Sequence, residues 1–376
     1  PELLDATREL AEPSGRPFVI VLDNAHRLAE SRSRYLDALM STLETARAES
    51  RSLHVILVGS AGGLPTTHDL GDLSGGAIDV GPLPFRAAAQ LLPGSSPEEL
   101  LRAYSVFGGI PKVLATVDPS VTTETNVRRL VLDPGARLQE AGAEWLERDV
   151  LTPGRYYAIL MALADGECDW ATLHAGVPDL TTSGQVAPYL RRLEDLGIVA
   201  IRRSLDARPR SRARRYAIVD PFLSFWFGFV LRRILDLGHG WSNDEFGRIV
   251  RAELDRHLVS IFPEVCRQHM RHDSVATIGE GTREVGSLWG PGYDIPVAGI
   301  LASGGAFYGS CHWATLKASE NPLDQLGEQV RETRYGYGRQ HRMTLVFTRT
   351  DPPRWLRRDA AKRPHAELVS TRDLLG

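Results

Sequence analysis

Residues 185–197 read QVAPYLRRLEDLG, and the segments on either side are interpreted from this stretch. Its apolar side chains recur at the three- and four-residue spacing of one helical face. This stripe comprises Val186, Tyr189, Leu190, Leu193 and Leu196. Polar side chains fill the rest of each turn, and Gly197 is placed to end the helix. The pattern predicts an amphipathic helix with one buried face and one polar face.

Two shorter helical segments precede this helix, and a hairpin follows it. Residues 155–164 are apolar at helical spacing, and residues 170–174 predict a short second helix. After the glycine, residues 198–201 and 215–219 predict two strands on either side of an arginine-rich loop. Three helices and a two-stranded wing make a winged helix-turn-helix, whose third helix is built to enter a DNA major groove.

The loop of the hairpin is strongly basic. Residues 202–215 carry seven arginines against one acid, Asp206. A guanidinium cluster on a mobile loop suits phosphates or a narrow minor groove. The predicted DNA contacts, on the third helix and the wing, are Gln185, Arg191, Arg192, Arg202, Arg203, Arg208, Arg210, Arg212 and Arg214. There are two alternatives to DNA contact. The loop could be an ordinary solvated loop, or the winged helix could serve only for packing between domains.

The composition is typical of a globular protein with no global attraction to nucleic acid. The 376 residues suffice for two or three domains, with 43% hydrophobic residues, 24% charged residues and a formal net charge of −3. Any DNA binding must therefore come from local patches. Only three of the 44 basic residues are lysines, which weakens the argument from an arginine cluster. Three scattered cysteines, no signal peptide and no membrane-length apolar run predict a cytoplasmic protein without membrane contact.

Residues 1–84 are expected to form part of a parallel α/β sheet. Residues 17–24 are an apolar run that ends in Asp23 and Asn24, and residues 53–60 are a second run that ends in Ser60. Both runs predict buried parallel strands. Ligands of such sheets bind beyond the carboxyl ends of the strands. Asp23 stands where a P-loop ATPase holds Mg²⁺, and Ser60 where a sensor residue contacts the γ-phosphate. The signal is weak by itself, because many strands end in Asp.

Helices are predicted over 85–150, and alternating helices and strands over 240–376. Gly108 and Gly109 mark a turn between helices, after which Pro111 begins the next helix. The expected C-terminal elements are a helix over 246–261, strands over 284–289, 293–300 and 306–313, a helix over 322–333 and a strand over 343–348.

Several motifs, in their order, resemble the archaeal-type AAA/STAND-like ATPases of prokaryotes, whose C-terminal domain is similar to PD-(D/E)xK nucleases. They are Val21-Leu22-Asp23-Asn24, Val58-Gly59-Ser60, Pro82-Leu83-Pro84-Phe85, Gly108-Gly109-Ile110-Pro111 and the stretch 216–227. The resemblance covers nearly the whole chain. It implies an α/β fold with part of a P-loop ATPase sheet (1–84), a helical lid (85–150), a winged helix (151–230) and a restriction-endonuclease-like domain (240–376). It also implies ATP, Mg²⁺ held by Asp23, and DNA as a partner.

The sequence departs from this family at the residues that carry its chemistry. No Gly-Lys-[Ser/Thr] phosphate loop occurs in residues 1–376, so we expect no ATP or Mg²⁺ bound to this chain itself. Asn24 replaces the family's water-polarising glutamate, and an amide is not a base. In the C-terminal domain, Asp294 matches the first acid, but Ser310 and His312 replace the glutamate and lysine of Gly-Glu-Cys-Lys-Trp.

We therefore expect the nuclease fold to be retained, with Trp313 buried against a neighbouring helix, and the nuclease chemistry to be lost. One carboxylate does not hold a catalytic Mg²⁺ pair. The alternative is an active site rebuilt on Asp294, His312 and Glu245.

A zinc site on Cys266, His269 and His272 is disfavoured, because their helical spacing spreads them around the helix and no fourth ligand is evident. Two functional hypotheses follow. In the first, the parent protein is an ATPase switch whose nucleotide state repositions a DNA-binding winged helix. In the second, the chain is a non-catalytic DNA-binding or scaffold protein derived from such an ATPase, acting by itself, as an oligomer or with a partner protein.

Overall fold

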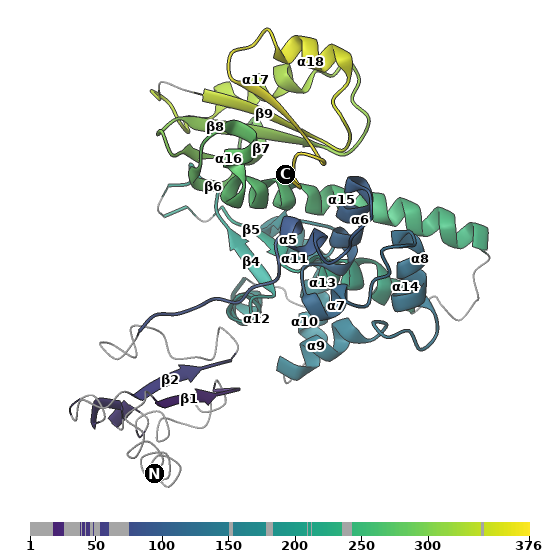
Figure 1. The fold of residues 1–376 in the computed structure, drawn as a ribbon, viewed down its shortest axis with the longest axis vertical. Helices are drawn as coiled ribbons and strands as arrows, with labels where there is room; N and C mark the ends of the chain where they lie inside the picture. Colours follow the sequence, from purple (N-terminus) through teal and green to yellow (C-terminus); the bar gives the residue numbers. More distant parts are fainter. Residues whose placement is uncertain are drawn as a thin grey trace. The chain divides into compact units, whose positions relative to one another are not determined.

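The computed structural model describes residues 18–25, 53–59, 75–149, 153–177, 183–208, 210–211, 213–234, 243–339 and 342–376, with scattered positions between 38 and 48. The fold is mixed α/β, as predicted, and Figure 1 shows its elements. The chain divides into two compact units, one of residues 1–81 and 191–197, the other of residues 82–190 and 198–376. The segments predicted as lid, winged helix and nuclease-like domain lie almost wholly in the second unit.

The first unit contains two parallel strands, as its apolar runs predicted. Strand β1 (Phe18–Leu22) pairs with β2 (Leu53–Leu57) from Phe18↔Leu53 to Leu22↔Leu57. The expectation that both strands are buried is wrong for one set of side chains, since Val19, Val21, Ile56 and Val58 are about half exposed. An apolar run shows that a strand can be buried on both faces, but it does not show that other elements pack on both of them.

The second unit begins with a helical segment. Its helices are α5 (Phe85–Ala89), α6 (Pro97–Phe107), α7 (Pro111–Leu114), α8 (Thr123–Val127), η3 (Arg128–Leu132) and α9 (Ala141–Asp149). Helix α6 begins where the Ser96 hydroxyl accepts a hydrogen bond from the Glu99 amide, and it ends at Gly108, whose φ is +66°. Pro111 begins α7, as predicted.

The next segment holds three helices and three short strands. They are α10 (Pro153–Leu163), β3 (Cys168–Asp169), α11 (Trp170–Ala175), α12 (Ser183–Asp195), β4 (Val199–Arg202) and β5 (Arg215–Ile218). Val186, Leu190 and Leu193 of α12 are buried, which confirms the apolar stripe. The two predicted hairpin strands, β4 and β5, pair antiparallel, and the sequence missed the third strand of the sheet, which has the order β3-β5-β4. Strand β3 has two residues, too few to show an alternating pattern.

Helices α13 (Pro221–Phe225), η4 (Trp226–Val230), α14 (Leu231–Ile234), α15 (Asn243–His272) and α16 (Ser274–Ile278) precede a five-stranded sheet. The remaining elements are β6 (Thr282–Gly290), β7 (Tyr293–Leu301), β8 (Ala306–His312), α17 (Pro322–Glu332), β9 (Arg342–Thr348), α18 (Arg354–Ala360) and β10 (Ala366–Ser370). The strand order is β10-β9-β8-β7-β6, with β6, β7 and β8 antiparallel and β8, β9 and β10 parallel. The sequence predicted α15 too short and missed α16, α18 and β10.

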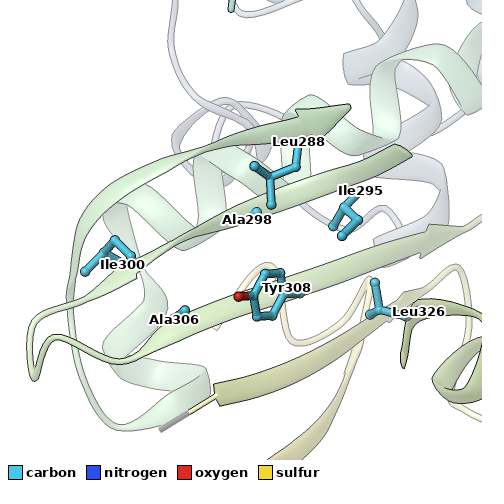
Figure 2. Close-up of a cluster of buried hydrophobic side chains, with 7 residues drawn as sticks. All are labelled: Leu288, Ile295, Ala298, Ile300, Ala306, Tyr308 and Leu326. Carbon is cyan, nitrogen blue, oxygen red and sulfur yellow. The ribbon is translucent and has the colours of Figure 1, made fainter. Parts of the chain in front are cut away.

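Helices cover both faces of this sheet (Figure 1). Figure 2 shows one core cluster, which joins β6, β7 and β8 to α17 and contains Leu288, Ile295, Ala298, Ile300, Ala306, Tyr308 and Leu326. Phe262 of α15 packs against Trp313 just beyond β8, with ring centroids 5.7 Å apart. Trp313 is buried against its neighbouring helix, as predicted.

Three motifs that carry the family resemblance meet in the second unit. The Leu83 amide donates to the Gly109 carbonyl at 2.8 Å, and a Cβ on Gly109 would lie 2.1 Å from the Leu83 oxygen. A Cβ on Gly108 would lie 2.9 Å from Oδ2 of Asp220. The other oxygen of Asp220 accepts the Leu223 amide and caps α13. The glycines are therefore required by close packing of two segments distant in sequence.

Candidate nucleic-acid interface

The base of the arginine-rich loop is fixed to the edge of the five-stranded sheet. Residues 204–206 run along β6, where the Leu205 amide donates to the Ser287 carbonyl at 3.1 Å and Ser204 Oγ accepts from the Trp289 amide at 3.0 Å. The Leu205 side chain packs on the core cluster of Figure 2. This pairing covers part of an edge strand. The expectation of a mobile loop is thus wrong for its first residues.

Asp206, the acid expected among the arginines, is an anchor of this contact. Its Oδ2 accepts hydrogen bonds from the Tyr293 hydroxyl at 2.5 Å and the Thr333 hydroxyl at 2.9 Å. Tyr293 begins β7 and Thr333 follows α17. The wing base therefore joins three elements of the C-terminal sheet domain, and within the described residues the hydrogen-bond partners of Asp206 are hydroxyl groups and not the arginines beside it.

The tip of the loop is exposed. Arg203, Arg208 and Arg210 are exposed and Arg214 is half-buried, and in the described part of the chain none of the four has an ion pair. Arg212 lies outside the described residues. On α12, Gln185 and Arg191 are exposed and Arg192 is half-buried. Most of the predicted DNA contacts that are described are therefore accessible to a ligand.

Arg202, which we also predicted as a DNA contact, is held inside the molecule. Its Nη1 lies 2.6 Å from Glu167 and its Nη2 lies 2.8 Å from Glu264 on α15. Glu264 also pairs with Arg267 at 2.8 Å and Arg271 at 2.9 Å. Burial works to raise the pKa of Glu264, but these guanidinium groups lower it to about 2. Arg202 therefore belongs to a network of ion pairs with Glu167 and Glu264.

Arg215, at the start of β5, holds the carboxylate of Asp294. Its Nη1 and Nη2 donate to the two carboxylate oxygens at 3.0 and 2.9 Å, a bidentate geometry that planar guanidinium and carboxylate groups favour. The guanidinium also lies 4.6 Å from the Trp289 ring centroid and 3.6 Å from Glu167. Burial works to lower the pKa of Arg215, but Asp294 and Glu167 raise it on balance.

These groups line a cleft of about 530 Å³ in the second unit, between the small sheet, α15, β7 and β8. Asp294, Ser310 and His312 all line it. Ser310 Oγ and His312 Nε2 are 3.0 Å apart, because residues two apart on β8 lie on the same side of the strand. Burial lowers the pKa of His312. The structure thus brings the three predicted residues to one cleft, but the carboxylate faces an arginine from β5.

Of the residues considered for zinc, Cys266 and His269 have other partners and His272 is exposed. Cys266 hydrogen-bonds Cys311 of β8, and burial together with this bond raises the pKa of Cys266 well above its usual range. His269 Nε2 lies 2.6 Å from the Thr277 hydroxyl. Throughout the described ranges, no group of three or more His, Cys, Asp or Glu is arranged to hold a metal ion. The side chain of Glu245, invoked for a rebuilt active site, is outside what the structure describes.

Comparison with known proteins gives one weak relative. A stretch of 200 residues, 52% of the chain, is 23% identical to "Uncharacterized protein MJECL04" of Methanocaldococcus jannaschii. The match covers 43% of that protein, so the chain spans less than half of its length. No family model matches the chain. In the part of the chain that is described, no helix is long and apolar enough to cross a membrane.

The residues predicted to contact a nucleotide lie in the first unit. Asp23 and Asn24 follow β1 and are exposed, and Asp23 Oδ1 accepts the Asn24 amide at 2.8 Å. Asn24 has a φ of +54°, which asparagine tolerates better than most residues. Ser60 lies outside the described residues.

Sequence reasoning missed four residues that build the cleft and the wing contact: Glu167, Glu264, Trp289 and Tyr293. Glu264 stands in a helix rich in charged residues, so its sequence neighbourhood does not mark it as the buried one. Glu167 precedes the two-residue strand β3, and Trp289 and Tyr293 lie near the turn between β6 and β7. Their roles depend on partners far away in the sequence.

Proposed function

We propose that this chain is a DNA-binding protein, in which a winged helix is held on a nuclease-like domain that does not cleave. The element order α10-β3-α11-α12-β4-β5 fits a winged helix with α12 as its recognition helix. The order of α15, three antiparallel strands, α17 and a parallel strand fits the core of PD-(D/E)xK nucleases. Both assignments are part of the proposal.

The observation that carries the proposal is the division of the wing into a fixed base and an exposed basic tip. The base is held by Leu205, Asp206 and Arg215. The tip presents Arg208 and Arg210, exposed and without ion pairs in the described ranges, and Arg203 is exposed just before the base. A basic loop with a rigid base offers phosphates a preorganised contact, since less entropy is lost on binding.

The contacts in the cleft support the loss of nuclease chemistry. A metal-dependent nuclease needs its carboxylates free to bind cations. Here both carboxylate oxygens of Asp294 accept hydrogen bonds from Arg215, and Ser310 and His312, whose pKa burial lowers, also line the cleft. Such groups provide neither a second acidic ligand nor a lysine.

The proposal includes no nucleotide step. ATP and Mg²⁺ belong to the ATPase class that the sequence resembles, and the residues here do not fit them. Asp23 is suitably placed after a parallel strand, but residues 1–376 contain no phosphate loop and Asn24 is no base. Calorimetry with ATP and Mg²⁺ should show no tight binding, and a sub-micromolar dissociation constant would contradict this part of the account.

The wing is tested by duplex binding. Fluorescence anisotropy of a labelled DNA duplex, over a series of salt concentrations, should show a steep salt dependence. The variant Arg208→Ala/Arg210→Ala should bind more weakly, and its salt slope should fall by about 2, roughly one per lost phosphate contact. The matched control is Arg357→Ala/Arg358→Ala on α18, which removes the same charge elsewhere. Equal effects of the two variants would refute the wing as the contact surface.

A further inference from the structure

The turn after α17 presents an unusual aromatic residue. The side chain of Tyr337 is 84% exposed, and no other aromatic residue among those described is an exposed large hydrophobic. Large rings normally bury most of their surface. A single exposed apolar side chain is common on protein surfaces, so its meaning depends on what surrounds it.

The backbone beneath this ring is held in place. The Tyr337 amide donates to the Arg334 carbonyl at 3.1 Å, and the Tyr335 carbonyl accepts the Tyr308 hydroxyl at 2.6 Å. Gly336 has a φ of +69°, and a Cβ there would lie 2.5 Å from the Tyr308 hydroxyl. The turn is therefore packed directly on the sheet. It presents an exposed ring on a fixed backbone, which limits the entropy lost when a ligand stacks on it.

Exposed arginines flank Tyr337 in the sequence. The described residues between 331 and 342 include four exposed arginines, Arg331, Arg334, Arg339 and Arg342, against one acid, Glu332. A second carboxylate beside the turn, Glu284 of β6, accepts a hydrogen bond from the Tyr335 hydroxyl at 2.6 Å. The turn thus combines an accessible aromatic face with a local excess of positive charge.

The turn is also connected to the wing. Thr333, which begins it, donates to Asp206 in the wing base. Tyr337 is four residues beyond Thr333 and Arg208 is two residues beyond Asp206, so the two surfaces lie within roughly 25 Å of one another. A nucleic acid bound at the wing tip can therefore reach the turn with a few nucleotides.

We propose that residues 334–339 contact single-stranded nucleic acid, with Tyr337 stacking on an unpaired base and the arginines contacting phosphates. This combination of aromatic faces and cations is how proteins hold unpaired strands without sequence preference. The site goes beyond the duplex contact of the wing and does not depend on it. A duplex with a single-stranded tail, which engages both surfaces, should bind more tightly than a blunt duplex.

The test compares Tyr337→Ala with Tyr337→Phe in the full chain. Anisotropy is measured with labelled oligothymidylate, oligouridylate and a blunt duplex. Loss of stacking in Tyr337→Ala should weaken binding of a single strand by about 5- to 100-fold, whereas Tyr337→Phe should stay within about twofold of wild type. Blunt-duplex affinity should not change. The two oligonucleotides show whether the preferred strand is DNA or RNA.

Three results would overturn the proposal: no single-strand binding by wild type, equal binding by wild type and Tyr337→Ala, or an equal loss of duplex binding in that variant. The last result would assign the ring to the duplex surface. Failure of the wing proposal can be told apart from failure of this one. In that case Arg208→Ala/Arg210→Ala would leave duplex binding unchanged, while Tyr337→Ala would still weaken single-strand binding. If Tyr337 bound a partner protein instead of nucleic acid, wild type and Tyr337→Ala would bind the single strand equally, which is the second result.

Discussion

Replacing Arg215 by alanine should release the wing from the sheet domain. The substitution removes the bidentate ion pair with Asp294, the longer pair with Glu167 and the cation–π contact with Trp289. The Arg215 side chain is 23% exposed and that of Asp294 is 60% exposed. The ion pair is therefore strongly screened on one side, and its loss should cost about 1 kcal/mol, below the range for fully buried charged hydrogen bonds.

The cation–π contact adds about 1 kcal/mol, and the packed aliphatic stem adds roughly 0.5 kcal/mol. We therefore expect Arg215→Ala to lower the free energy of unfolding of its unit by about 2–3 kcal/mol. Asp294→Asn should cost less, because Arg215 retains Glu167. The double variant should show a coupling of about 1 kcal/mol between the two residues.

Urea unfolding measures the magnitude, and hydrogen exchange with mass spectrometry locates the change. Exchange should accelerate in peptides that cover residues 204–216 and 287–295, where the wing and β6 meet. The matched control is Arg214→Ala, which removes the neighbouring charge but no ion pair known in the described ranges. The reasoning is refuted if the two arginine variants are equally stable, or if exchange in the wing is unchanged.

Three further predictions concern the packing and chemistry of the second unit. Gly108→Ala should cost at least about 1 kcal/mol more than Gly94→Ala in thermal unfolding, because both have positive φ but only Gly108 abuts Asp220. Burial raises the pKa of Asp220 to about 6, so the stability that goes with its neutral carboxyl group is lost as the pH rises through 6. Burial lowers the pKa of His257 to about 4, so the stability that goes with its neutral imidazole is lost as the pH falls through 4. The stability of Asp220→Asn relative to wild type should therefore increase by up to about 3 kcal/mol between pH 4 and 7, and a constant difference in urea midpoints would contradict this. Linear, branched and single-stranded DNA should remain intact with Mg²⁺ or Mn²⁺; cleavage that disappears in Asp294→Ala would instead support the rebuilt active site.

The local elements of the second unit were largely predictable from the sequence. Helix α12 followed from its apolar spacing, and the turn at Gly108 followed from the glycine pair and the proline after it. These signals involve neighbouring residues, which share one element and therefore one periodic pattern. Short elements such as β3, and strands near the end of the chain such as β10, lacked a pattern long enough to recognise.

The candidate site was predicted only in part. The sequence identified Asp294, Ser310 and His312 as a group, and the structure places them in one cleft. It gave no sign that Arg215, 79 residues before Asp294, holds that carboxylate. The sequence groups Arg215 with the other arginines of the wing, because charge density in a sequence does not distinguish a cation held in an ion pair from an unpaired one. Ion-pair partners are set by tertiary packing, and no local signal records them.

The central claim, that the wing tip contacts DNA, is tested most directly by photo-crosslinking. A photoreactive phenylalanine analogue is placed at Ala213, which is exposed beside the wing arginines, or at Ala361, which is exposed after α18. After irradiation with a labelled duplex, the account predicts crosslinked DNA from the wing position and none above background from α18. Equal crosslinking from both positions, or crosslinking from α18 only, would contradict it.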